Sequence, residues 1–283
     1  MKRLRILHKT GFRYGGEVTA SYNEARMLPV SGERQLVLHS NLDVDPVSSH
    51  HQYTDYWGTR VLAFDVLAPH SELTITASSL VEVLAAPPHP EAGPGWDELD
   101  TVVQGSGEYV QQLWQTPLTD PPADVIALAR EARAAAGDDP AAAGLAIARA
   151  VGDSMEYVSG VTAVSSTAAD AWASRKGVCQ DITHVAVGAL RAAGLPARYV
   201  SGYLHPQADA VIGETVVGES HAWVEWFCGS WRGYDPTNQL DIGDRHVRVG
   251  HGRDYTDVAP LRGVYAGTAG SQLFVSVAIT RET

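Results

Sequence analysis

The chain changes its residue pattern at one proline- and glycine-rich stretch, and this change limits the folds that it can adopt. The stretch, residues 86–98, holds four prolines and two glycines and predicts a linker or an extended crossing segment. Upstream lie segments that alternate or run in β-branched and aliphatic residues, as strands do: residues 34–44, 60–68 and 71–85. Downstream lie segments with the length and composition of helices: residues 98–115, 121–136 and 138–158, the last with Asp139 as a candidate cap.

The second half of the chain returns from helices to strands. A helix is predicted directly after Cys179 and ends at Gly194. Strand patterns follow at residues 197–205, 221–228, 231–237 and 273–280. Strands, then helices, then strands favour an α+β fold over a doubly wound one. We expect a β-rich N-terminal domain at residues 1–90 and a second domain, helices packed on an antiparallel sheet, at residues 91–283.

Composition excludes several classes of protein. The net charge of −12 and the pI near 5.3 argue against a nucleic-acid binder, which needs a basic surface. Two cysteines in 283 residues do not make a disulfide scaffold, and no cysteine–histidine spacing suits zinc. We therefore expect no metal and no cofactor. No apolar run is long enough for a membrane span or a secretory leader, so we expect a cytoplasmic protein with no membrane partner.

One of the two cysteines stands at the predicted start of a helix. In SRKGVCQDIT, Cys179 follows Gly177 and Val178, so the free N–H groups of a first helical turn could stabilise its thiolate and an oxyanion on a substrate. Gly177 would allow a sharp turn and close approach of a substrate. The alternative is a buried, inert cysteine. Asp181 could cap the helix, but its charge would oppose a thiolate unless the side chain points away.

A nucleophilic cysteine needs a base and a group that orients the base. His221 opens an aromatic-rich strand in ESHAWVEW and is the best candidate for the base. Asp235 ends the next strand in WRGYDPTN and is the candidate for the orienting carboxylate. The alternatives are a surface or structurally satisfied histidine and an ordinary turn aspartate before proline.

The length of the hairpin loop between these two strands tests the pair. A two-residue turn, Gly229-Ser230, would put His221 and Asp235 on opposite faces of the sheet. A three-residue loop would pair Trp223 with Asp235 and make His221 a diagonal neighbour of Asp235, about 7–8 Å away between backbones. The catalytic interpretation therefore requires an odd-length loop or a bulge.

The segments GVCQD, HAWVE and YDPTN occur here in the order and rough spacing of the transglutaminase-like superfamily of papain-type cysteine enzymes, which the chain resembles. MEYVSGVTAV, LRAAGLPARYVSGYL and GRDYTDVAPLRGVYAG are similar to bacterial transglutaminase-like proteins, and SYNEARMLP and DYWGTRV to their β-rich N-terminal domain. The resemblance implies a papain-like transglutaminase core with a triad of Cys179, His221 and Asp235.

The resemblance also implies a reaction. Cys179, activated by His221, would attack an amide carbonyl and leave a thioester acyl-enzyme. Hydrolysis of peptide or isopeptide bonds is the leading hypothesis; the alternatives are acyl transfer to an amine and an inactive binding or assembly module. Tyr157 and Gln180 are further candidates for oxyanion or substrate contacts. Trp223 is another such candidate, because one of Trp223 and Trp226, which face opposite sides of their strand, is expected to line the site.

Overall fold

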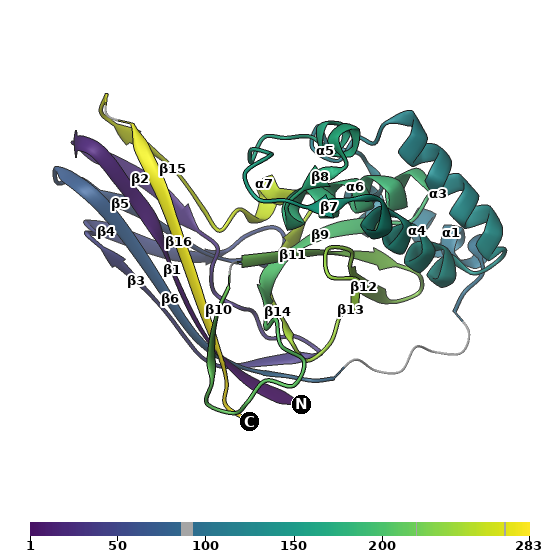
Figure 1. Cartoon of the computed structure of the whole chain (residues 1–283), viewed down its shortest axis with the longest axis horizontal. Helices are drawn as coiled ribbons and strands as arrows, with labels where there is room; N and C mark the ends of the chain where they lie inside the picture. The colour runs from purple at the N-terminus through teal and green to yellow at the C-terminus, as the bar shows by residue number, and fades with distance from the viewer. Residues whose placement is uncertain (86–92, 219, 269) are drawn as a thin grey trace.

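The computed structural model describes residues 1–85, 93–218, 220–268 and 270–283, so residues 86–92 of the expected linker lie outside the described residues. The chain forms two lobes (Figure 1). One lobe is a sandwich of two β-sheets, and the other packs helices around a third sheet. The expected α+β fold, with a β-rich N-terminal region ahead of the helices, is confirmed.

The sandwich is built mainly from the N-terminal part of the chain. One of its sheets has the order β10 (Thr215–Gly218), β16 (Ser271–Arg281), β1 (Lys2–Val18), β6 (His70–Val83) and β3 (Gln35–Asp45). The other has the order β15 (Leu261–Ala266), β2 (Ala20–Ala25), β5 (Arg60–Val66) and β4 (Ser49–Thr54). Alternate residues of facing strands, such as Ile75 and Phe64, fill the space between the sheets.

The helical lobe surrounds α6, which carries the candidate nucleophile at its first residue. Its antiparallel sheet has the order β13 (Leu240–Asp241), β12 (Trp231–Asp235), β11 (Ser220–Phe227), β9 (Ala197–Leu204) and β14 (His246–Gly252). Its helices are α1 (Trp96–Gln104), α2 (Val110–Leu113), α3 (Ala123–Ala136), α4 (Pro140–Ser154), α5 (Ala168–Ser174), α6 (Cys179–Ala192) and α7 (Tyr255–Val258), with a 3₁₀ turn at Gly107–Tyr109. A small parallel ladder joins β7 (Glu156–Tyr157) to β8 (Lys176–Gly177).

Local sequence signals explain where several helices begin and end. Asp139 caps α4 as expected, since its Oδ1 accepts the N–H groups of Ala141 and Ala142 at 3.0 Å. The helix expected at residues 98–115 is interrupted instead. It ends at Gln104, and Ser106 then caps the 3₁₀ turn through the N–H of Glu108.

The division into domains needs one correction at its C-terminal end. The chain was expected to stay in the second domain from residue 91 to 283. β15 and β16 instead return to the two sheets of the sandwich, where they pair with β2 and β1. β10 also pairs with β16, after which the chain enters the third sheet as β11. Single strands carry no sign of which sheet they will join, so the sequence pattern could not show this return.

A hydrophobic core of its own holds the two lobes together. Leu4, Ile6 and Val277 of the sandwich pack with Tyr203 and Val247 of the third sheet, and all five side chains are almost completely buried. Burial of large apolar side chains on both sides favours a fixed arrangement of the lobes over hinge motion. The space between the lobes is therefore set by side-chain packing.

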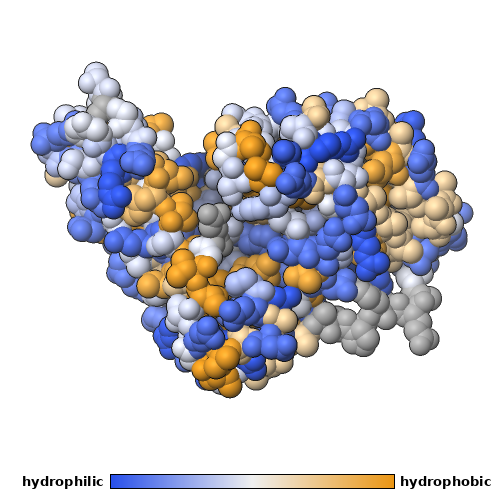
Figure 2. Space-filling model, viewed as in Figure 1, coloured by the Kyte–Doolittle hydropathy of each residue, from blue (hydrophilic) through white to orange (hydrophobic). Residues whose placement is uncertain are grey.

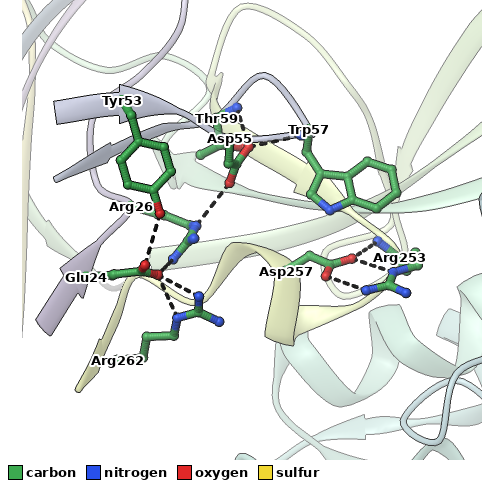
Figure 3. Close-up of polar contacts among 9 residues, drawn as sticks. All are labelled: Glu24, Arg26, Tyr53, Asp55, Trp57, Thr59, Arg253, Asp257 and Arg262. Carbon is green, nitrogen blue, oxygen red and sulfur yellow. Dashed lines mark hydrogen bonds and ion pairs between the residues drawn. The ribbon is translucent and has the colours of Figure 1, made fainter. Parts of the chain in front are cut away.

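A turn of the sandwich makes a second contact with the helical lobe (Figure 3). The Asp55 carboxylate accepts the N–H groups of Trp57 and Thr59 and so shapes the turn between β4 and β5. Arg26 donates to the other oxygen of Asp55 at 3.2 Å. This turn presents Trp57 to the helical lobe. There the guanidinium carbon of Arg253 lies 5.8 Å from the centre of the Trp57 ring.

Gly188 offers a test of how tightly α6 is packed. A Cβ atom at this position would lie 2.1 Å from the carbonyl oxygen of Thr119, a contact that backbone movement must relieve. Gly188→Ala should therefore lower the free energy of unfolding by about 1–3 kcal/mol, although alanine favours helices. Gly107→Ala, where a Cβ would meet nothing within 4 Å, is the control in urea unfolding experiments. Equal stability of both variants would contradict this packing.

Candidate active site

The hairpin between β11 and β12 has the three-residue loop that the catalytic interpretation requires. Phe227 pairs with Trp231, and Val224 pairs with Tyr234, so the loop comprises residues 228–230. This register places His221 and Asp235 on the same face of the sheet. The expected condition on the loop is confirmed.

His221 and Asp235 form a short hydrogen bond in the interior. His221 Nε2 lies 2.7 Å from Asp235 Oδ2, and the Asp235 side chain is fully buried. Asn238 Nδ2 donates to the same oxygen at 2.9 Å. The other oxygen accepts the backbone N–H groups of Thr237 and Asn238 at 3.0 and 3.1 Å. The turn that follows β12 thus solvates the buried carboxylate and fixes its orientation.

Each member of this pair changes the pKa of the other. Burial opposes the charged forms of both groups, but their hydrogen bond outweighs it: the pKa of His221 is raised and that of Asp235 is lowered. The contribution of His221 to stability is therefore present below its unfolded pKa of about 6.5 and is lost as pH rises through its folded pKa. That of Asp235 is present above its unfolded pKa of about 3.9 and is lost as pH falls.

A second histidine faces the buried carboxylate. His246 Nδ1 accepts the N–H of Gly243 at 3.2 Å, so the proton of the neutral ring is on Nε2. That nitrogen lies 3.5 Å from Asp235 Oδ2, at the outer limit of a hydrogen bond. Burial lowers the pKa of His246, so this ring is neutral at pH 7 and presents an N–H dipole to the carboxylate.

Cys179 is the first residue of α6, as expected. Asp181 turns back along the helix, and its Oδ2 accepts the N–H of Val178 at 2.8 Å and the hydroxyl of Thr162 at 2.7 Å. A Cβ on Gly177 would lie 2.6 Å from the Cβ of Asp181, so only glycine fits there. Burial raises the pKa of Asp181.

Cys179 and His221 meet in a cleft between the lobes, which Figure 2 shows as a hollow between the sandwich on the left and the helical lobe on the right. The cleft has a volume of about 210 Å³. A hydrogen bond with the Cys179 side chain contributes to the raised pKa of His221. Because Nε2 is bound to Asp235, Nδ1 is the nitrogen left for the thiol. The structure thus brings the three predicted residues together.

Comparison with protein families gives the chain an affiliation. Residues 4–82 match the bacterial transglutaminase-like N-terminal region, and residues 126–236 match the transglutaminase-like superfamily. The chain belongs to the transglutaminase-like superfamily. Its relatives include "Uncharacterized protein ML0607" of Mycobacterium leprae, which is 44% identical over 99% of both chains. "Uncharacterized protein Rv2569c" of Mycobacterium tuberculosis is 33% identical over 97% of this chain and 91% of its own.

The fold is shared with a solved structure of the same size. It is described as a "Putative Cysteine Protease" from Cytophaga hutchinsonii and is 20% identical to this chain. The two structures superpose with a TM-score of 0.74 over 99% of this chain and 97% of the other. The likeness therefore extends over both lobes of this transglutaminase-like protein.

The other predicted site residues have different positions. Tyr157 and Gln180 line the cleft, and the Gln180 amide donates to the carbonyl of Val164 at 3.1 Å. Trp223 does not line it, which corrects the expectation of a substrate contact. Its side chain is 1% exposed and packs edge-on against His246, with its ring centre 6.4 Å from that of His221. Trp223 thus supports the histidines from behind.

Two tyrosines in the cleft were missed by sequence reasoning. Burial raises the pKa of both Tyr199 and Tyr255, and the nearby Cys179 raises each further, so both phenols remain protonated and can donate hydrogen bonds. His184 accepts the backbone N–H of Tyr255 at 3.1 Å and so holds α7 against α6. Period-two alternation in β9, where Tyr199 and Ser201 share a face, was a signal that could have pointed to this wall.

Within the described ranges, no cluster of three or more histidine, cysteine, aspartate or glutamate side chains is arranged to hold a metal ion. Over the same residues, no helix combines the length and apolar character needed to cross a membrane.

The raised pKa of His221 can be observed directly. In NMR titrations of ring-labelled histidines, His221 should stay protonated at neutral pH and lose its proton only in the alkaline range. Asp235→Asn should lower the pKa of His221, because the amide keeps a hydrogen-bonding group but removes the charge. His246 is the internal control, since burial should keep it neutral at pH 7 in both proteins. A pKa of His221 near 6.5 in the wild type would contradict the pairing.

Proposed function

We propose that this protein is an amide hydrolase that uses Cys179 as its nucleophile. One observation carries the proposal: His221 is bound through Nε2 to the fully buried carboxylate of Asp235, and its free side faces Cys179 in a cleft. A thiol next to a base, with the base oriented by a third group, is the arrangement of nucleophilic catalysis. Membership of the transglutaminase-like superfamily supports this assignment.

In the first step, a thiolate forms and attacks the amide carbonyl. His221 accepts the proton of Cys179, and Asp235 stabilises the imidazolium that results. The sulfur adds to the amide carbonyl, and the carbonyl oxygen becomes an oxyanion. The backbone N–H of Cys179 lies at the start of α6, where helix N–H groups without intrahelical partners are available to this oxygen. The protonated phenols of Tyr199 and Tyr255 are further donors in the same cleft.

The second half of the reaction resolves a thioester. His221 returns its proton to the leaving amine as the C–N bond breaks, which leaves the acyl group on Cys179. Water, deprotonated by His221, then attacks the thioester carbonyl, releases the carboxylic acid and regenerates the thiol. An amine in place of water would give acyl transfer through the same intermediate.

Loss of Cys179 should abolish turnover. We would incubate the protein with mixed peptide and isopeptide libraries, with and without an added primary amine, and read the products by mass spectrometry. The wild type should release acids, whereas Cys179→Ala and His221→Ala should release none. Asp235→Asn should lose about 10⁴-fold in rate if its role parallels that of the aspartate in serine proteases. Cys228→Ser is the matched control, because Cys228 is a buried thiol outside the cleft.

The outcomes of this experiment separate the candidate functions. Adducts with the added amine would assign acyl transfer in place of hydrolysis. Retained activity in Cys179→Ala would remove the triad from the mechanism. No turnover in any protein, together with an unreactive Cys179 thiol, would favour a binding or assembly module.

A further inference from the structure

Two neighbouring strands of the sandwich form the cleft wall that faces the helical lobe. β1 contributes His8 and Thr10, and β16 contributes Leu273 and Val275. Thr10 lies opposite Val275 in the antiparallel ladder, so the four side chains point to the same face of the sheet. A strand backbone therefore runs along the cleft that contains Cys179.

The outer edge of β16 is only partly covered. β10 pairs with β16 from Val277 to Thr280. Among the described residues, no strand pairs with this edge over residues 271–276, which at the rise of a β-strand span about 20 Å. The uncovered length begins where β10 ends, two residues before β11 opens with the Ser220–His221 dipeptide.

Ladder parity shows which backbone groups face this edge. The N–H of Glu282 donates to the carbonyl of Arg3. At the other end of the ladder, the hydrogen bond with β1 is again made by an even-numbered residue, just before β16. Even-numbered residues of β16 therefore point their N–H and C=O groups toward β1, and odd-numbered residues point theirs outward. Leu273 and Val275 thus combine outward backbone groups with side chains in the cleft, and these side chains are 54% and 44% exposed.

His8 adds an acceptor to the same wall. The Tyr203 hydroxyl donates to the carbonyl of Met27 at 2.8 Å, so it accepts from His8 Nδ1 at 2.9 Å. His8 Nε2 is then an acceptor, and it is buried with no hydrogen-bond partner among the described residues. Burial lowers the pKa of His8 to about 4, which keeps the ring neutral. His8 lies opposite Val277, where β10 covers the edge of β16, so this nitrogen belongs to the closed end of the wall.

We propose that the acyl donor is a polypeptide segment that binds in extended form as an added strand on the edge of β16. Extended polypeptide supplies N–H and C=O groups at the spacing of the outward groups of Leu273 and Val275. Lipid and sugar chains lack this repeat.

This inference rests on the proposed function, and its test uses probes that report on both separately. Iodoacetamide measures the reactivity of the Cys179 thiol without using the β16 edge. Peptidyl vinyl sulfones of randomised sequence, from one to six residues long, alkylate the same sulfur after binding. On the wild type, the inactivation rate constant should rise with peptide length.

Val275→Pro removes one outward N–H and blocks strand addition, while proline at an outward position of an edge strand is tolerated by the fold. The gain from peptide length, taken for each protein as the ratio of its peptidyl to its iodoacetamide rate constant, should fall by about tenfold, the upper end of the worth of one lost backbone hydrogen bond. Gln52→Pro is the matched control, because it lies on β4, an edge strand of the other sheet and away from the cleft. A length gain that survives in Val275→Pro would overturn the inference.

A second measurement needs no variant. Single ester-for-amide replacements along a six-residue vinyl sulfone remove one N–H donor at a time. Strand addition predicts that the rate constant falls at every second position, since alternate residues of an edge-bound strand face its partner. A uniform effect along the peptide would contradict strand addition even if Cys179 is fully reactive. A Cys179 thiol whose iodoacetamide reactivity does not depend on His221 would instead refute the proposed function.

Discussion

The candidate site depends on the burial of one charge, the carboxylate of Asp235. A buried carboxylate is costly unless it is paired and hydrogen-bonded, and here the surrounding structure meets that need on every side. The turn after β12 supplies two backbone N–H groups, Asn238 supplies an amide, and His221 supplies the partner that becomes charged. Because the carboxylate is fixed in this way, the imidazole that it orients can serve Cys179 with its other nitrogen.

The cleft around this site results from the path of the chain through both lobes. β10 leaves the sandwich sheet and continues as β11, so the strand that carries His221 is anchored in both sheets. β16 returns to the sandwich and forms part of the same wall. Val277 and Ile279, in its C-terminal half, are buried against the helical lobe. The catalytic interpretation and the proposed peptide-binding edge therefore use the same fixed junction between lobes.

Local sequence patterns predicted much of the site. Cys179 after a glycine-containing turn, His221 at a strand start and Asp235 before Pro236 were candidates because each local signal is carried by adjacent residues, and the resemblance to the transglutaminase-like superfamily joined them into a triad. The length of the hairpin loop followed from side-chain parity and was confirmed. The contributions of His8, Leu273, Val275 and His246 could not be predicted, because they depend on which strands become neighbours across long stretches of the chain. The role of Trp223 was predicted wrongly for a related reason. Its face of the strand was known, but the side chains that bury it were not.

The rate of alkylation of Cys179 by iodoacetamide against pH tests the central claim most directly. It would be measured with Cys228→Ser as background, in the otherwise unchanged protein and in His221→Ala. A thiolate paired with a protonated His221 should react rapidly at neutral pH and keep much of this rate under mildly acidic conditions, and removal of the imidazole should abolish that advantage. A rate that rises only in the alkaline range, and that is the same with and without His221, would contradict an assembled Cys179–His221–Asp235 triad.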